Sequence, residues 1–250
     1  MLTATRPAAL LFALALAGLA ALPAGAGTPL LEPRLTLHSL PHQQPQLALT
    51  LDACSGKADG RIFSALVANR IPATVFVTAR WLRRNPEALK LMLDHPDLFQ
   101  IENHGNRHIP AVDVPGKVYG LAAAGSAEAV RAEVTAGAGA ILAATGRAPR
   151  WFRGATARYN SGALHEIAAT GEAVAGYSLR ADDGAALSAP GVRKRLAAAR
   201  DGDVILAHVN HPEKPAGEAL VQGILALKAR GYLFVRLGAP PAAPLSHRGS

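Results

Sequence analysis

Histidine and aspartate residues recur at the ends of short apolar runs in this sequence. His104 and His108 are four residues apart, and Asp52 and His208 each close an apolar run. Two histidines at this spacing face the same side of a helical turn, as do the two of the H-E-x-x-H motif. Zinc binds two imidazole nitrogens plus a carboxylate and keeps one position for water. These residues therefore predict a hydrolytic site with a divalent metal ion, for which zinc is the expected metal.

The elements that must hold these side chains follow from the hydrophobic pattern. Short apolar runs rich in β-forming residues alternate with Ala-, Leu- and Arg-rich stretches. The seven expected strands are 47–53, 73–79, 99–104, 150–153, 173–179, 203–209 and 232–237. The expected helices are 59–69, 86–94, 126–145, 161–170, 192–200 and 217–230. This alternation predicts parallel strands joined by right-handed crossovers.

Two α/β architectures fit seven strand–helix units: a doubly wound open sheet and a barrel with one unit fewer than eight. The dinucleotide-binding open sheet needs a GxGxxG loop after its first strand, and the sequence has none there. Active sites of parallel barrels lie at the carboxyl ends of the strands. Five of the seven expected ends carry a chemically capable side chain, namely Asp52, His104, Arg153, Asp182 with Asp183, and His208. The missing loop counts only against the dinucleotide-binding form of the open sheet, and the fold we expect is an incomplete, seven-stranded parallel (β/α) barrel.

Composition narrows the class of protein. Half of the 250 residues are hydrophobic, which excludes a disordered or collagen-like chain, and Cys54 is the only cysteine, which excludes a disulfide scaffold. The formal net charge of +8 suits an anionic cell-wall polymer or a membrane surface as partner. The sequence contains no run of lysines and arginines of the kind that would indicate a nucleic-acid partner.

The first 26 residues have the pattern of a secretory signal peptide. Arg6 precedes an apolar run that ends at an A-x-A cleavage site, residues 24–26. The run is shorter than the roughly 20 residues that span a bilayer, so we expect cleavage and no membrane span afterwards. The expected location is secreted or periplasmic.

Three further segments complete the expected organisation. Residues 27–46 hold four prolines and form an N-terminal lead-in segment. Residues 47–238 form the catalytic domain, and residues 239–250 form a flexible tail.

Five segments, in chain order, resemble the motifs of the polysaccharide deacetylases, which are metal-dependent carbohydrate esterases with a chitooligosaccharide deacetylase homology domain. They are 50–56 (TLDACSG), 104–108 (HGNRH), 151–159 (WFRGATARY), 177–183 (YSLRADD) and 206–208 (LAH). The family motifs are T-F-D-D-G, H-[ST]-x-x-H, R-P-P-Y, an Asp beyond W-S-V, and L-x-H. The third motif matches only at Arg153 and Tyr159, and Gly105 replaces the hydroxyl residue of the second. The resemblance covers about residues 47–237.

The resemblance implies a role for each site residue. The implied roles are Asp52 as the general base for a metal-activated water, His104 and His108 as metal ligands, His208 as the general acid, Arg153 as the residue that orients Asp52, and Asp183 as the residue that tunes His208. Asp182 competes with Asp183 for the last role. Trp151 and Tyr159 are the candidate substrate-binding aromatics, because aromatic faces pack on sugar rings, although core packing is the commoner role of such side chains.

One departure concerns the third metal ligand. The resemblance assigns that ligand to the second Asp of T-F-D-D-G, and this chain has Ala53 there. Asp52 could bind the metal as well, Cys54 could supply a thiolate, or Glu102 or Asn103 could turn toward the metal. We expect Asp52 to bind the metal in addition to its role as general base.

The expected function is that of an exported, metal-dependent hydrolase that removes N- or O-acetyl groups from a polysaccharide or cell-wall glycan. Two alternatives remain open. One is a catalytically impaired glycan-binding module on the same barrel, which Ala53 favours. The other is a metallohydrolase of another bond, such as a phosphoester.

Overall fold

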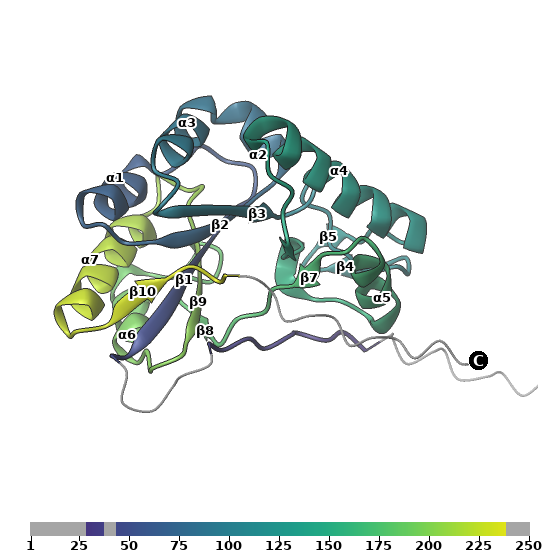
Figure 1. The fold of residues 1–250 in the computed structure, drawn as a ribbon. Coiled ribbons are helices and arrows are strands. Elements are labelled where there is room, and N and C mark those ends of the chain that lie inside the picture. The colour runs from purple at the N-terminus through teal and green to yellow at the C-terminus, as the bar shows by residue number, and fades with distance from the viewer. Residues whose placement is uncertain (1–28, 38–43, 239–250) are drawn as a thin grey trace, which may run out of the picture.

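The computed structural model describes residues 29–37 and 44–238, and the sheet at its centre consists of parallel strands (Figure 1). The strands are β1 (Gln46–Ala53), β2 (Ala73–Val77), β3 (Phe99–Asn103), β6 (Trp151–Phe152), β7 (Ala173–Val174), β8 (Leu179–Arg180), β9 (Val204–His208) and β10 (Leu233–Val235). Their order is β7-β6-β3-β2-β1-β9-β8, and β10 pairs with β1. The predicted signal peptide at 1–26 and tail at 239–250 lie outside the described residues. Within the described part, no helix is long and apolar enough to cross a membrane.

The predicted strand 173–179 exists as two pieces, which form the two edges of the barrel sheet. Its first piece, β7, is one end of the strand order, and its second, β8, is the other end. Between them the chain leaves β6 and reaches β9, because Ser178 donates its backbone N–H to Val204 O over 3.0 Å. The chain bends at Gly176, where a Cβ would lie 2.2 Å from Pro33 O. This arrangement confirms the predicted incomplete, seven-stranded (β/α) barrel.

In the described part of the chain, seven α-helices cover the outside of the sheet (Figure 1). They are α1 (Gly60–Ala68), α2 (Ala79–Arg84), α3 (Pro86–Asp94), α4 (Ala127–Thr145), α5 (Ser161–Ala169), α6 (Ala189–Ala197) and α7 (Pro215–Ala229). Four of them begin after a side chain that accepts a backbone N–H, which satisfies a free donor of the first turn; these caps are Asp59, Thr78, Ser126 and Asn160. Thr78 ends the predicted strand 73–79 early and starts α2, which the hydrophobic pattern missed.

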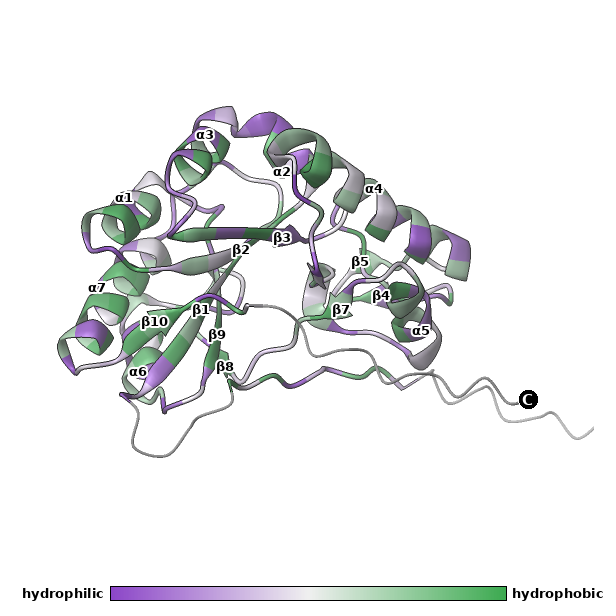
Figure 2. Cartoon of the chain, in the orientation of Figure 1, coloured by the Kyte–Doolittle hydropathy of each residue, from purple (hydrophilic) through white to green (hydrophobic). Residues whose placement is uncertain are grey.

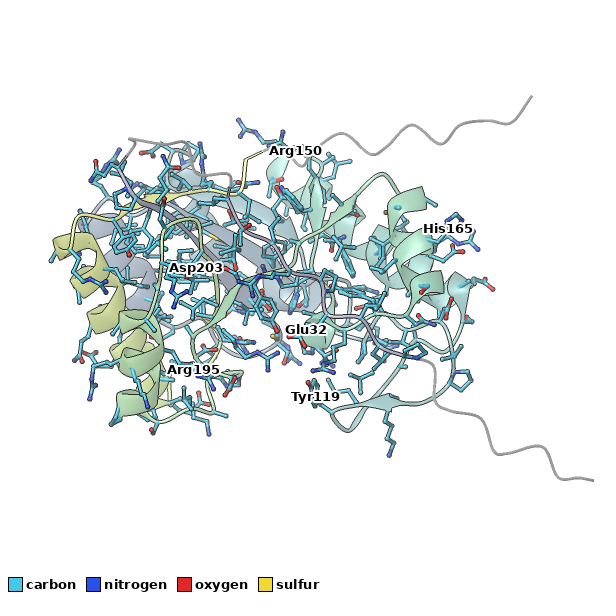
Figure 3. The ribbon with its side chains drawn as sticks, turned by 90° about the horizontal axis from the view of Figure 1, so that it is seen from below. Glu32, Tyr119, Arg150, His165, Arg195 and Asp203 are labelled. Atoms are coloured by element: carbon cyan, nitrogen blue, oxygen red, sulfur yellow. The ribbon has the colours of Figure 1, made fainter. Side chains whose placement is uncertain are left out.

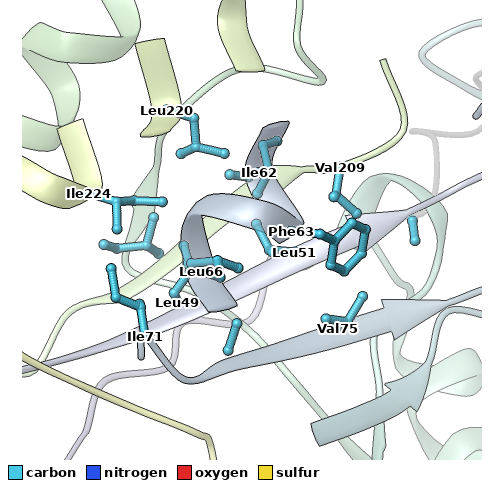
Figure 4. Packing of buried hydrophobic residues seen from close by; sticks show 14 of the residues in the cluster. Leu49, Leu51, Ile62, Phe63, Leu66, Ile71, Val75, Val209, Leu220 and Ile224 are labelled. Carbon is cyan, nitrogen blue, oxygen red and sulfur yellow. The ribbon is translucent and has the colours of Figure 1, made fainter. Parts of the chain in front are cut away.

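The alternation of β1 divides its side chains between two environments. Leu49, Leu51 and Ala53 face the helices in an apolar cluster that Figure 4 shows at close range around Phe63. Burying each large apolar side chain contributes about 1.5–3 kcal/mol to folding. Hydrophobic residues accordingly line β1, β9 and the helices packed on them (Figure 2). The opposite face of β1 therefore carries Asp52 toward the barrel interior.

The lead-in segment is part of the fold where it is described. Leu31 and Tyr159 exchange two backbone hydrogen bonds of 2.7 and 3.0 Å, and Leu37 donates its N–H to Gly202 O over 2.8 Å. Residues 29–37 thus run from Tyr159, beyond the carboxyl end of β6, past Tyr177 to Gly202, before the amino-terminal end of β9. They bring Glu32 to the mouth of the site described below.

A short antiparallel hairpin lies between β3 and α4. Its strands are β4 (Lys117–Val118) and β5 (Leu121–Ala122). Strands of two residues leave no periodic signal, which is why the hydrophobic pattern does not predict them.

Candidate metal centre and active site

The carboxyl ends of β1, β3 and β9 open into one cavity of about 500 Å³. Its lining includes Asp52, Cys54, His104, His108 and His208. A larger cavity of about 720 Å³ opens at the amino-terminal side of β3, away from these groups. Convergence of titratable side chains, rather than size, therefore identifies the smaller cavity as the candidate site.

Three of these side chains form a group able to hold a metal ion. One ligand atom each from Cys54, His104 and His108 lies within 4.8 Å of the other two. Cys54 Sγ is 3.4 Å from His104 Nε2, and the two imidazole rings have centroids 5.0 Å apart. One thiolate and two imidazoles are a donor set that zinc prefers. The residues present therefore fit the metal that the sequence predicts.

A hydrogen bond to the backbone of Arg153 orients the imidazole of His104. Its Nδ1 lies 2.5 Å from the backbone oxygen of Arg153, and a carbonyl only accepts, so Nδ1 carries a proton. Nε2 is then the atom that faces Cys54 and that would bind a metal ion. A backbone acceptor on the remote nitrogen fixes both ring orientation and tautomer in metal sites.

The thiol of Cys54 ionises easily in this setting. Burial alone would raise its pKa, but the positive charge of His104, with hydrogen bonds from His104, His108 and His208, holds the pKa of Cys54 well below its usual range. Burial would lower the pKa of His104, and the charges of Asp52 and Cys54 outweigh that effect and raise it. A thiolate is the form of cysteine that binds metal.

Asp52 is held by a fully buried guanidinium. Arg153 Nη1 donates to Asp52 Oδ1 over 3.0 Å and to Thr50 Oγ1 over 2.8 Å, and Nη2 donates to Gly176 O over 2.9 Å. Burial would raise the pKa of Asp52, but Arg153 outweighs burial and lowers it. The structure thus brings Arg153 into contact with Asp52, the residue that the resemblance implies it orients. The carboxylate stays ionised in a site that excludes most water.

The structure revises the third metal ligand. Asp52 does not belong to the group of ligand atoms described above, whereas Cys54 does. Glu102 points elsewhere, since its Oε2 accepts the backbone N–H groups of Arg150 and Trp151. Positions 52 and 54 share a face of the extended chain, so both can reach the cavity while the residue between them packs outward. Of the alternatives weighed for the third ligand, Cys54 is therefore the one that lies with His104 and His108 in a group able to hold a metal ion.

Asn103, the remaining alternative for the third metal ligand, also has its side-chain atoms hydrogen-bonded to other groups. Its side-chain nitrogen donates to both oxygens of Glu172 and to Val134 O, and its oxygen accepts the N–H of Gly105. This residue braces the loop that follows β3.

His208 is paired with Asp182 and not with Asp183. Asp182 Oδ1 lies 2.9 Å from His208 Nδ1, and Asp182 Oδ2 accepts the backbone N–H of His208 over 2.7 Å. Asp183 also lines the cavity, but it has a φ of 49° and its two oxygens form an ion pair of 2.7 Å with Arg195. The predicted contact of Asp183 is therefore wrong. Burial would lower the pKa of His208, but Asp182 outweighs it and raises the pKa well above its usual value.

The two aromatic residues expected to bind substrate are structural. Trp151 is buried against Phe76, and its Nε1 donates to Gly238 O over 3.0 Å. Tyr159 is fully buried, and its hydroxyl accepts the N–H of Gly154 over 2.8 Å. Neither side chain lines the cavity. Both predictions are wrong because these rings fill the interior beside the strand that presents Arg153.

Other aromatic and charged residues at the cavity mouth were not predicted. They are Tyr119, Tyr177 and Arg180. Tyr119 and Gly120 sit at the tip of the β4–β5 hairpin with positive φ values of 48° and 81°. A tyrosine–glycine pair between short apolar runs was the only sequence signal for this turn.

A buried carboxylate outside the cavity holds the loop that carries both histidines. Glu133 of α4 is 4% exposed, and its Oε1 accepts the backbone N–H of Arg107 over 2.8 Å and of Ile109 over 3.1 Å. A Cβ at Gly105, whose φ is 89°, would lie 2.5 Å from the same oxygen. The two bonded amides flank His108, which has a φ of 66°. Glu133 therefore fixes the backbone that aims His108.

We expect Glu133→Ala to weaken zinc binding about 10–100-fold, the usual cost of removing a residue that orients a metal ligand. Glu133→Gln is the matched control and should bind zinc almost as wild type does, since both bonds use one oxygen that an amide also supplies. Competition with a chromogenic chelator measures the affinity. Equal affinities of the alanine variant and the wild type would remove Glu133 from this role.

Comparisons with known proteins agree with this geometry. The profile of the polysaccharide deacetylase family matches residues 40–175, just over half of the chain. No curated protein matches the sequence. Among solved structures, the chain is similar to a CE4 family pseudoenzyme from Bacillus anthracis, with a TM-score of 0.61 and 20% identity over 78% of this chain and 64% of that chain.

Two further structures are similar in fold. For the peptidoglycan deacetylase PdaC from Bacillus subtilis the TM-score is 0.62, with 22% identity over 78% of this chain and 88% of that chain. For a family 4 carbohydrate esterase from Streptomyces lividans, in complex with acetate, the TM-score is 0.61, with 20% identity over 79% of this chain and 98% of that chain. This chain covers less than two thirds of the pseudoenzyme. At these identities the likeness shows the fold.

Proposed function

Because this chain belongs to the polysaccharide deacetylase family, we propose that it is an exported, metal-dependent enzyme that removes acetyl groups from a cell-wall glycan. One observation carries the proposal: a Cys54–His104–His108 ligand group opens into the same cavity as Asp52 and His208. Export rests on the signal pattern of residues 1–26, and the cell-wall substrate rests on export and the basic charge. Because the family profile ends at residue 175, the placement of His208 is independent support.

Cys54, His104 and His108 would hold the metal ion, for which we propose zinc. Bound zinc supplies a Lewis acid that polarises the acetyl carbonyl and lowers the pKa of water. The thiolate replaces the negative charge that the family draws from an aspartate at position 53, so the loss of that aspartate does not empty the site of anionic ligands.

The other residues handle protons. Arg153 keeps Asp52 ionised, so this carboxylate takes a proton from the attacking water. Asp182 keeps His208 protonated, so the imidazole gives its proton to the leaving nitrogen or oxygen. The two groups have pKa values displaced in opposite directions, as a base and an acid that work at one pH require.

The binding-module alternative keeps one observation in its favour. Position 53 lacks the family aspartate, and one structural neighbour is described as a pseudoenzyme. A module of this kind would bind an acetylated glycan without releasing acetate. A metallohydrolase of another bond would instead turn over a phosphoester.

The experiment that separates these functions is acetate release from a panel of N- and O-acetylated glycans, run beside an aryl phosphate. We expect acetate from at least one glycan and no phosphate release. Glycan binding without acetate would establish the module. Phosphate release alone would establish the third function.

His208→Ala should lower turnover by about 100-fold or more, since a positioned general acid contributes about 10²–10⁴-fold. The metal content should stay at the wild-type level, because His208 is outside the ligand group. Elemental analysis of the purified variant beside its kcat checks both parts. Loss of metal together with activity would make His208 a ligand.

The pH profile of the reaction should respond to Asp182. In the wild type, activity should fall on the acid side as Asp52 is protonated and on the alkaline side as His208 loses its proton. Asp182→Asn removes the charge that raises the pKa of His208, so the alkaline limb should move to lower pH while the acid limb stays in place. Asp183→Asn is the control and should leave the alkaline limb nearly unchanged. If the alkaline limb stayed at the same pH in Asp182→Asn, the loss of activity at high pH could not be assigned to deprotonation of His208.

A further inference from the structure

A second cavity lies apart from the candidate metal centre. It has a volume of about 720 Å³, a size typical of ligand sites, and it is bounded by β3, by the segment between α4 and β6, and by the residues after β10. Figure 3 shows Arg150, which lines this cavity, and Tyr119, which lines the candidate site, at opposite edges of the molecule. The function proposed above makes no use of this cavity.

One wall of the cavity is formed by β3, which pairs with β6 at a single position, Asn103 with Phe152. At that position Arg153 donates its N–H to Asn103 O over 2.9 Å. Two residues earlier on both strands, a regular parallel ladder would join Trp151 N–H to Ile101 O. The ladder stops before this bond is made.

Two residues keep the ladder open. Glu102 takes the donor, because its Oε2 accepts the N–H of Trp151 over 2.8 Å. Pro149 has no N–H to give to the oxygen of Phe99. In the part of the chain that the structure describes, Phe99 O and both backbone groups of Ile101 therefore have no backbone partner on this edge. An open edge of this kind can pair with an added strand.

Three arginines surround this edge. Arg147, Arg150 and Arg236 line the cavity, whereas the ion pairs among the described residues involve other arginines. The segments outside the described residues contain no Asp or Glu. Among the described residues that line the cavity, Glu102 is the single acid, and its oxygens are already bonded to Gln100 and to two backbone N–H groups. The uncompensated positive charge favours an anionic ligand.

We propose that this cavity binds an extended acidic peptide, whose backbone pairs with the open edge at Ile101 and whose carboxylates pair with the three arginines. The incoming strand would accept the N–H of Ile101 and donate to its oxygen, as in β-strand addition. Alternate side chains of an extended chain point to opposite sides. Acidic residues can therefore face the arginines while apolar residues between them face Met92 and Leu93. Such binding depends neither on the metal centre nor on deacetylation.

The test is binding of a fluorescein-labelled hexapeptide of alternating valine and glutamate, measured by fluorescence anisotropy. We expect saturable binding that weakens as salt is added, because exposed ion pairs are screened. A hexapeptide of alternating valine and lysine should not bind. Arg147→Gln, Arg150→Gln and Arg236→Gln should each weaken the Kd about 2–5-fold, the range of an exposed ion pair. Arg193→Gln, on α6 and outside the cavity lining, is the matched control and should bind as wild type does.

Amide hydrogen exchange, followed by NMR, tests the backbone pairing separately. In the free protein the N–H of Ile101 should exchange faster than those of Gln100 and Glu102, whose backbone groups point to β2. The peptide at ten times its Kd should slow exchange at Ile101 about 10-fold.

Three results would overturn the proposal. The first is the absence of saturable binding by the valine–glutamate peptide, or equal binding by the wild type and all three arginine variants. The second is binding that leaves exchange at Ile101 unchanged, since the cavity would then attract charge without recognising a peptide backbone. The third is tighter binding of polygalacturonate than of the peptide, which would assign the cavity to an anionic polysaccharide.

Discussion

Asp52→Asn is expected to slow acetate release by about 10²–10⁴-fold, the usual contribution of a positioned general base. The asparagine has the same shape as the aspartate but cannot take a proton. Arg153 loses its counter-charge and keeps three other acceptors, Thr50 Oγ1, Ala175 O and Gly176 O. The variant should therefore fold with reduced stability. The rate is to be measured well below the thermal midpoint of the variant.

Two further readouts give this result its meaning. Zinc content should remain at the wild-type level, because Asp52 is outside the ligand group. Urea unfolding of both proteins separates a chemical defect from a folding defect, since removal of one partner of a buried ion pair costs up to about 3–5 kcal/mol. Undiminished activity would remove Asp52 from the role of base. Loss of zinc would return it to the role of ligand.

Cys54→Ala is expected to lower zinc affinity by more than about 100-fold, since even residues that only orient a ligand are worth about 10–100-fold. The variant loses the only anionic member of the ligand group, and two imidazoles remain. Acetate release should fall with the metal. Cys54→Asp is the matched variant, because it restores a charged oxygen ligand at the same position, and it should recover a substantial part of both zinc affinity and activity.

The outcome of the cysteine variants decides between two third ligands. Wild-type zinc affinity in Cys54→Ala would contradict the assignment to Cys54. If Asp52→Asn then lost zinc, the ligand would be Asp52, as the sequence alone suggested. Isothermal titration with zinc at a fixed pH measures the affinity of both proteins, and the fixed pH is needed because metal affinity depends on the protonation of the ligands.

Strand ends and motif spacing were sufficient to predict the barrel and most of the titratable side chains that meet at its cavity. His104, His108, His208 and Asp52 do converge, because parallel strands place their carboxyl ends at one edge. The pairing of Arg153 with Asp52 also followed from the motif. These features depend on chain order and strand direction, which a sequence carries directly.

Other features depended on side-chain direction at single positions. Asp182 and Asp183 differ by one residue, and only the turn after β8 decides which one faces His208. Trp151 and Tyr159 lie beside the right motif but point into the interior. The outcome for these residues was set by tertiary packing, which overrides local pattern.

The third ligand and the hairpin were hidden for a different reason. The side chain of Cys54 reaches the cavity because β1 ends at Ala53 and the next residue continues the inward face. Glu133 and Tyr119 come from segments that belong to none of the matched motifs. A family pattern marks the residues that a family shares, so the parts of a site peculiar to this chain required its structure.

The most direct test of the account measures acetate release by the protein without residues 1–26, first freed of metal by a chelator and then given one equivalent of zinc. The account predicts that release falls to background in the chelated protein and returns with zinc. Release that survives the chelator would contradict it. If iodoacetamide then stopped that release, the reaction would belong to the Cys54 thiol acting with His208 and Asp182, and not to a metal centre.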